Sequence, residues 1–283
     1  MKFAYNNVSK LSSAQYVLLG VPDERGSHAM RKGSSLAPTR IRRVSCLRST
    51  FYRQKKTSIV QSSDKLLKMS LFDAGNIKKS EVSSKVDLIL RKNKFPIILG
   101  GDHSITVEIL RGFQHHFKRL AFIYFDAHPD FVCSTRKYYG SVVCDISDFP
   151  YIDLSRSLEI GVREPEAEEL RALRTRHLFS INPYHYPIQD VEKTFSIIKK
   201  RVGGIPVYIS LDMDVVDPAF APGVSTPVPG GISSITLLSL LRRIATLRIV
   251  GFDIVEVCPT YDIQNMTSHL AVKSIVEFLG TAK

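Results

Sequence analysis

Short apolar runs recur along the chain, and most of them contain no alternating polar positions. The runs lie at 16–21, 71–73, 96–99, 120–125, 158–162, 177–181, 207–211 and 249–255. Continuous apolar runs of this length are typical of strands that are covered on both faces, as in a parallel sheet. We therefore expect a series of buried strands.

Between several of these runs, apolar residues recur at helical spacing. These stretches are 81–92, 105–117, 166–174, 191–201 and 235–245. Strands that alternate with helices indicate a three-layer α/β domain. No internal repeat and no long linker interrupts the pattern, so we expect one domain over residues 1–283. The segment 53–64 is rich in Ser, Lys and Gln, and we expect it to form an exposed, mobile loop.

The composition is that of a globular protein, because 44% of the 283 residues are hydrophobic and 23% are charged. No apolar stretch approaches the roughly 20 residues that a membrane-spanning helix needs, and residues 1–10 lack the apolar core of a signal peptide. The absence of a CxxC pair predicts reduced thiols and no disulfide or zinc site for the cysteines, which are Cys46, Cys133, Cys144 and Cys258. We expect a soluble, cytoplasmic protein without a membrane partner.

The net charge is +12, from 39 Lys and Arg against 27 Asp and Glu. Such a charge raises the possibility of a polyanion-binding protein. The basic residues are scattered, however, and the densest clusters, 40–43 and 53–56, lack interleaved aromatic residues on which bases could stack. A solvated basic surface is favoured over a nucleic-acid site.

Polar residues interrupt the apolar pattern where four of the expected strands end. They occupy 100–104, 126–130, 212–214 and position 256. In open parallel sheets, ligands bind outside the carboxyl ends of the strands. Four strands therefore deliver acids and histidines to the same edge.

The spacing of these acids predicts a metal site. Side chains two residues apart in an extended segment point in the same direction, so Asp126, His128 and Asp130 are expected to point towards one place. Asp212 and Asp214 have the same spacing. Four buried aspartates would repel one another, and two divalent ions would balance them. Carboxylates and imidazoles without thiolates suit manganese, and bridging carboxylates would hold two ions about 3.5–4 Å apart around a shared hydroxide.

Each of these groups also has a purely structural interpretation. Asp side chains in a turn can accept hydrogen bonds from backbone amides. Asp102 or Ser104 could cap a helix that begins near Ile105. Several such groups at the ends of three strands favour the metal site over these alternatives.

The motifs resemble those of the ureohydrolases, the family of arginase, agmatinase and formiminoglutamase, over almost the whole chain. Gly33, Pro38, Arg42 and Gly230-Gly231 contribute to the resemblance. The longer motifs are GVPD (20–23), DAGN (73–76), GGDHS (100–104), DAHPD (126–130), SLDMDVVDP (210–218), PGVSTP (222–227) and DIVEV (253–257). The resemblance implies a three-layer α/β/α fold with an eight-stranded parallel sheet, a centre of two Mn²⁺ ions, and a homo-oligomer, a trimer or hexamer.

The resemblance also implies roles for single residues. One ion would be bound by His103, Asp126, Asp130 and Asp212, and the other by Asp126, His128, Asp212 and Asp214, with Asp126 and Asp212 bridging. Glu256 would hold the substrate guanidinium by paired hydrogen bonds. Hydroxide would attack the guanidinium carbon, and Asp130 would pass the proton to the leaving amine, giving urea and an amine.

Tyr139 departs from the family pattern, because the ureohydrolases usually have the histidine of a His-Gly pair at this position. A phenol with a pKa near 10 is a poor proton shuttle at neutral pH. Its hydroxyl can still donate a hydrogen bond. We expect Tyr139 to position the substrate, and the departure leaves open a metal-binding homologue with little turnover.

The substrate is expected to be agmatine, hydrolysed to putrescine and urea. The loop at 131–137 does not match the segment with which arginases bind the amino-acid head of arginine. Glu166 aligns with a family acid that can meet a distal amine, or it simply favours the dipole of a helix, and Thr226 is a further expected substrate contact. If Arg136 and Lys137 face the pocket, they would instead favour a carboxylate tail, so arginase and formiminoglutamase remain alternatives.

Overall fold

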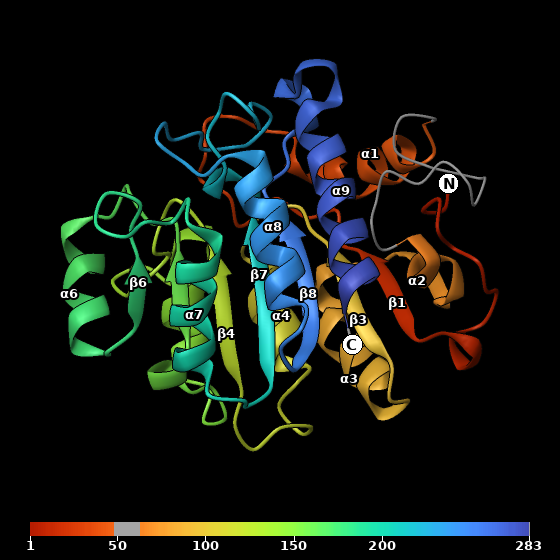
Figure 1. The fold of residues 1–283 in the computed structure, drawn as a ribbon, viewed down its shortest axis with the longest axis horizontal. Helices are drawn as coiled ribbons and strands as arrows, with labels where there is room; N and C mark the ends of the chain where they lie inside the picture. Colours follow the sequence, from red (N-terminus) through yellow and green to blue (C-terminus); the bar gives the residue numbers. More distant parts are fainter. Residues whose placement is uncertain (48–62, 283) are drawn as a thin grey trace.

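Eight parallel strands form one sheet in residues 1–47 and 63–282, the part of the chain that the computed structural model describes (Figure 1). The order across the sheet is β2-β1-β3-β8-β7-β4-β5-β6. The strands are β1 (Tyr16–Gly20), β2 (Leu71–Asn76), β3 (Phe95–Leu99), β4 (Ala121–Phe125), β5 (Leu158–Ile160), β6 (Phe179–Ile181), β7 (Val207–Asp212) and β8 (Ile249–Val255). All residues of β4 and β7 are buried, as their continuous apolar sequences predict.

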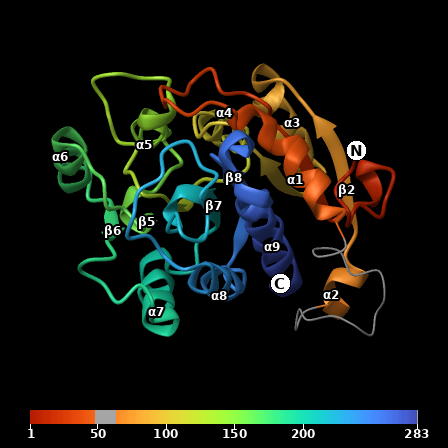
Figure 2. The ribbon, with the colours of Figure 1, turned by 90° about the horizontal axis from the view of Figure 1, so that it is seen from above.

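Helices cover both faces of this sheet (Figure 2). Alternate strand residues point to opposite faces, so Ile97 and Leu99 enter one core cluster and Ile98 enters the other. The first cluster packs against α1 (Ala37–Ser45), α2 (Ser63–Lys68), α7 (Val191–Val202), α8 (Ser234–Ile244) and α9 (Met266–Thr281). The second packs against α3 (Val82–Arg91), α4 (Ile105–Arg111), α5 (Val142–Ser147) and α6 (Ala167–Thr175).

This arrangement confirms the predicted three-layer α/β fold with an eight-stranded parallel sheet. The helices expected around 81–92, 166–174, 191–201 and 235–245 are present with ends shifted by at most one residue. Of the segment 53–64, only the last two residues, at the start of α2, belong to the described part of the chain. None of the helices in the described ranges has the length and apolar character that crossing a membrane requires.

One predicted helix ends early, and four helices in the described part of the chain were not predicted, namely α1, α2, α5 and α9. The helix expected over 105–117 ends at Arg111, because Gly112 follows, and there a Cβ would lie 2.7 Å from that of Val86. The missing side chain lets the two helices approach closely. The sequence pattern did not predict α9, because most of its residues are buried and it has little of the polar face that marks an amphipathic helix.

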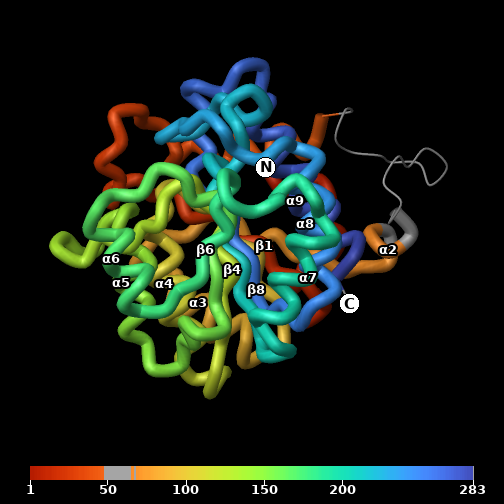
Figure 3. Tube along the Cα trace, turned by 60° about the vertical axis from the view of Figure 1, so that its left-hand side comes forward, coloured from red at the N-terminus to blue at the C-terminus, as the bar shows by residue number. Residues whose placement is uncertain are grey.

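The four strands that were expected to deliver polar residues are consecutive in the sheet. They are β3, β8, β7 and β4. Their carboxyl ends therefore lie side by side at the centre of one edge. The loops that follow β1, β7 and β8, coloured red, cyan and blue, gather at the same end of the molecule (Figure 3).

A buried ion pair ties α1 to this sheet. Arg42 donates from Nε and Nη2 to the two carboxylate oxygens of Asp73 on β2, at 2.8 and 2.9 Å. Its Nη1 also donates to Asn76 Oδ1 at 2.6 Å and to the carbonyl of Pro38 at 3.2 Å. Both charged side chains are almost completely buried. Removing one of them would leave the other charge uncompensated.

We expect Arg42→Ala to lower the free energy of unfolding by about 3–5 kcal/mol, the usual cost of breaking a buried ion pair. Urea denaturation of the metal-free protein measures it. The matched control is Arg25→Ala, which removes an arginine whose guanidinium contacts Asp23 but is 80% exposed, and its effect should be much smaller. Equal effects of the two substitutions would contradict the structural role of Arg42.

Candidate active site

A first group of acids surrounds one histidine nitrogen at the centre of the edge. His103 follows β3 and is fully buried. Its Nδ1 lies 3.0 Å from Asp126 Oδ2, 3.2 Å from Asp212 Oδ2 and 3.3 Å from Asp130 Oδ2. Three carboxylates that follow β4 or end β7 thus converge on one imidazole.

A second group lies beside the first and shares one carboxylate with it. His128 Nδ1 is 3.3 Å from Asp126 Oδ1 and 3.1 Å from Asp214 Oδ2. Asp126 therefore turns one oxygen towards each histidine, which is the arrangement of a bridging carboxylate. Asp212, also expected to bridge, faces His103 with Oδ2, while its Oδ1 accepts a 2.7 Å hydrogen bond from the backbone amide of Asp214.

Burial and mutual repulsion control the charges of this cluster. Burial raises the pKa of Asp130 and of Asp212 well above the usual range, and neighbouring aspartates raise both further. Burial also opposes ionisation of Asp214, but the His128 imidazole beside it holds the pKa of Asp214 below its ordinary value. A cluster of this kind is stabilised by cations.

Hydrogen bonds to the far side of the ring fix the orientation of His103. Its Nε2 lies 2.8 Å from Ser210 Oγ, and that hydroxyl donates to Asp253 Oδ1 at 2.8 Å. The single hydroxyl proton of Ser210 is used in the hydrogen bond to Asp253. Ser210 Oγ therefore accepts a hydrogen bond from the N–H at Nε2 of His103. In a neutral imidazole this leaves the lone pair on Nδ1. Nδ1 is the atom that faces the carboxylates, so His103 is oriented as a metal ligand.

Glu256 follows β8 and adds a further buried carboxylate. Its Oε1 accepts a 2.8 Å hydrogen bond from the backbone amide of His103, and its Oε2 is buried without a well-aligned hydrogen bond, with the Ser225 hydroxyl nearby. Burial raises its pKa to about 8, and the Asp102 carboxylate adds to the shift. A cationic donor at Oε2 would reverse this penalty. Glu256, directly after β8, and Asp130, in the segment after β4, both have a positive φ, of 61° and 47°, a conformation that is uncommon for residues other than glycine.

Tyr139 belongs to an aromatic group near the cluster. Burial raises the pKa of its phenol to about 12, and the carboxylates of Asp130 and Glu256 add to the shift, so the phenol is a neutral donor at neutral pH. Tyr138 stacks on His28 at 4.8 Å and meets Tyr139 edge-on at 5.7 Å. Local sequence patterns could not identify His28 as a member of this group, because its partners Tyr138 and Tyr139 lie more than 100 positions away.

The other expected substrate residues have structural contacts. Thr226 donates from Oγ1 to Asp214 Oδ2 at 3.0 Å, so it supports the acid cluster. Glu166 is exposed at the N-cap of α6 and forms a capping box with Glu169. Arg136 forms ion pairs with Asp145 and Asp148 at 3.2 and 3.0 Å.

The expectation of four reduced cysteines is wrong for one pair. Cys133 and Cys144 form a disulfide, with Cα atoms 5.6 Å apart, whereas Cys46 and Cys258 are free. The two cysteines are 11 positions apart in the sequence. The disulfide joins α5, which carries Cys144, to the start of the loop that contains Tyr138 and Tyr139. The disulfide thus closes the segment that carries two of the three aromatic residues.

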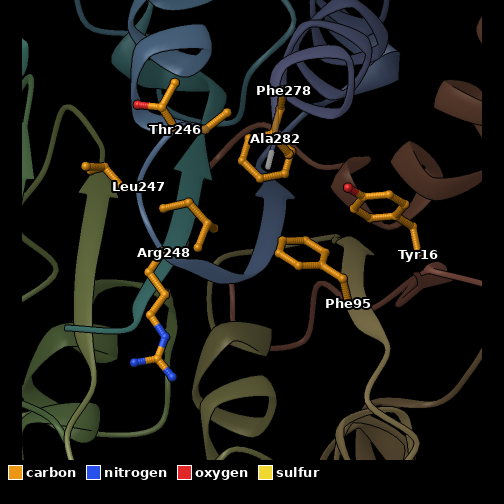
Figure 4. Close-up of a pocket in the computed structure, with 9 residues that line it drawn as sticks. Tyr16, Phe95, Thr246, Leu247, Arg248, Phe278 and Ala282 are labelled. Carbon is orange, nitrogen blue, oxygen red and sulfur yellow. The ribbon is translucent and has the colours of Figure 1, made fainter. Parts of the chain in front are cut away.

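A separate cavity of about 360 Å³ lies at the opposite edge of the sheet (Figure 4). Tyr16 and Phe95 begin β1 and β3, and Phe278 and Ala282 belong to the end of α9 or follow it. Its only charged lining residue is Arg248, and no acid or histidine lines it. This cavity therefore offers none of the acids and histidines that gather at the carboxyl edge.

Fold and motifs together define the class of protein. A model of the arginase family matches residues 14–280, so the chain belongs to the arginase family. It is a hydrolase that acts on C–N bonds of linear amidines. The resemblance to ureohydrolases that the motifs predicted is confirmed.

Individual members of this family are similar to the chain over most of its length. The chain is 34% identical over 278 residues to an agmatinase of Neisseria meningitidis serogroup C, covering 95% of this chain and 87% of that protein. It is 34% identical over 277 residues to the proclavaminate amidinohydrolase of Streptomyces clavuligerus, covering 93% and 86%. The solved agmatine ureohydrolase of Thermoplasma volcanium has a TM-score of 0.84 and 30% identity, covering 99% of this chain and 94% of that one.

We expect reduction of the Cys133–Cys144 disulfide to loosen the loop beside the site. A cross-link that closes a loop of about 15 residues contributes about 3 kcal/mol in the chain-entropy model. Dithiothreitol should therefore lower the melting temperature and speed tryptic cleavage after Arg136 or Lys137, which are both exposed.

The matched control is Cys133→Ala/Cys144→Ala, which should resemble the reduced protein and respond to dithiothreitol no further. Cys46→Ala removes an exposed free thiol and should change neither measurement. Unchanged melting and unchanged cleavage after complete reduction would contradict a role of the disulfide in holding this loop.

Proposed function

We propose that the protein is a manganese-dependent ureohydrolase that hydrolyses agmatine to putrescine and urea. The observation that carries the proposal is the division of Asp126 between two histidine–carboxylate groups, with the free Oε2 of Glu256 in the same buried region. Several agmatinases among the curated relatives support the substrate. A homo-oligomer, trimeric or hexameric, and a cytoplasmic location belong to the same proposal.

The donor set fits two divalent ions. Two groups each bring one imidazole nitrogen and two carboxylate oxygens close together. The first consists of His103, Asp126 and Asp212, and the second of Asp126, His128 and Asp214. Asp126 Oδ2 is buried without a well-aligned hydrogen bond, as expected of an oxygen that awaits a cation. Two divalent ions would balance the four aspartates, and oxygen and imidazole donors without thiolates suit Mn²⁺. When bound, such ions lower the pKa of water and so supply hydroxide near neutral pH.

The chain's own residues would hold the substrate and move the proton. Glu256 would accept N–H donors of the planar guanidinium at Oε2, which positions the guanidinium carbon beside the acid cluster. Asp130 would take the proton of the attacking water and deliver it to the leaving amine. Tyr139 would donate a hydrogen bond to the bound substrate, since its phenol stays protonated.

The surroundings of the loop favour a substrate without a carboxylate tail. Arg136 and Lys137 were the residues that could have attracted such a tail. The charge of Arg136 is taken up by Asp145 on α5 and by Asp148 directly after it, and Lys137 is exposed. Tyr138 and Tyr139 offer aromatic surface, on which an alkyl chain or a distal ammonium can pack. Arginase and formiminoglutamase activities are the alternatives.

Urea release with manganese present, measured on agmatine, arginine, formiminoglutamate and guanidinobutyrate, tests the substrate, with release of formamide as the readout for formiminoglutamate. We expect the highest kcat/KM with agmatine. Glu256→Gln should lower kcat/KM on agmatine at least about 30-fold, because a buried charge pair with the guanidinium is lost. Glu164→Gln, which changes an exposed acid after β5, is the control and should change little. A higher kcat/KM with arginine or formiminoglutamate would contradict the proposed substrate.

Metal analysis tests the centre. The manganese-saturated protein should contain two ions per chain. Asp126→Asn should reduce the content towards none, because both groups share this carboxylate, whereas His103→Ala should mainly weaken one ion. Mass spectrometry of the desalted protein measures the content, and a single ion in the saturated, unmutated protein would contradict the centre.

A further inference from the structure

A row of polar side chains crosses the sheet one step below the acid cluster. Its members are paired in register on five adjacent strands: Asp253, Ser210, Tyr124, Glu159 and Ser180. Residues paired in this way on parallel strands point to the same face. Polar groups in a buried sheet are costly unless they have partners, so each of them calls for an explanation. Ser210 and Asp253 orient His103, but Tyr124 has no role in the proposed reaction.

Tyr124 contacts two expected ligands of the same ion. It lies on β4 two residues before Asp126, on the same face, and is fully buried. Its ring stacks on His103 with centroids 4.4 Å apart and an angle of 1° between the planes. Its hydroxyl lies 2.7 Å from Asp130 Oδ2 and 3.1 Å from His103 Nδ1.

The direction of the hydrogen bond follows from the proton count. The phenol has one proton, and Asp130 can only accept when it is a carboxylate. Nδ1 of His103 faces three carboxylates and is the atom available to an ion, so the phenol proton belongs to Asp130. The hydrogen bond supports a residue that lies outside the strand and has a positive φ.

We propose that Tyr124 is a positioning residue that sets the affinity of one of the two metal positions, the one bound by His103 and Asp130, and leaves the other nearly unaffected. This rests on the proposed binuclear centre. The hydroxyl holds the Asp130 carboxylate, and the ring fixes the plane of the imidazole. Neither His128 nor Asp214, the residues particular to the second position, is among its polar contacts in the described structure.

Manganese titration of Tyr124→Phe tests the proposal, with calorimetry for affinities and electron paramagnetic resonance for paired ions. Phenylalanine keeps the stacked ring and removes only the hydrogen bond. We expect one binding step to weaken about 10–100-fold, as is usual when a partner of a ligand is lost, and the other to change less than about twofold. The paired-ion signal should then appear only at higher manganese concentration.

Two reference variants identify the affected position. Adding Tyr124→Phe to His103→Ala should weaken binding little further, because both act on the same position. Adding it to His128→Ala should impair both positions. The matched control is Tyr151→Phe, which removes another buried tyrosine hydroxyl, bonded to the carbonyl of Leu110, far from the cluster. It should lower the melting temperature of the metal-free protein similarly and leave both manganese affinities unchanged.

The proposal would be overturned if Tyr124→Phe weakened the binding of both manganese ions equally or of neither. It would also be overturned if Tyr151→Phe caused the same loss of affinity, or if the wild-type protein bound a single ion. Failure of the proposed substrate looks different. In that case the wild-type protein binds two ions and Tyr124→Phe weakens one, while no urea is released from agmatine.

Discussion

The rest of the structure depends on one constraint, the concentration of buried carboxylates at a single edge of the sheet. Asp126, Asp130, Asp212 and Asp214 are almost fully buried, although such groups repel one another and lose their hydration. Most positions along the central strands pack against apolar cores, and a carboxylate inside a strand, such as Asp253, needs several hydrogen bonds to be buried there. The acids therefore occupy the strand ends, where four neighbouring strands bring them together. The same topology that buries the strands also collects the charge.

Balancing the negative charge of these carboxylates depends on the orientation of the imidazole rings beside them. His103 is oriented by Ser210 and stacked on Tyr124, and Ser210 is anchored by Asp253, which also accepts hydrogen bonds from Tyr208 and Thr106. Buried polar networks are stable only when their members are satisfied. The polar row is satisfied at its His103 end, whereas Glu159 and Ser180 towards β6 lack well-formed partners among the described residues. Hydrogen bonding in the row is thus concentrated where ligands must be held.

The sequence predicted the strands, the shared edge and the acids, because these follow from local patterns with short periods. It predicted less well what depends on contacts between distant segments. Strand periodicity located Asp126 and His128, but only the register of β4 against β7 places Tyr124 beside Ser210. The helix α9 carries little amphipathic signal because it is largely buried. The stacking of His28 on Tyr138 and the Cys133–Cys144 disulfide could not be predicted, because both depend on how the loops pack in three dimensions.

The loop closed by the disulfide also connects the acid cluster to the aromatic group. The backbone amide of Val143 on α5 donates to the carbonyl of Asp130 at 2.9 Å, and the amide of Tyr139 donates to the carbonyl of Gly26 at 3.0 Å. Cys144 is the next residue of α5, so the cross-link, an acid of the cluster and the tyrosine share one short segment. A change in this loop would move Asp130 and Tyr139 together. Because catalysis requires the reacting groups to keep a fixed geometry, the stiffness of this loop matters as much as the identity of its side chains.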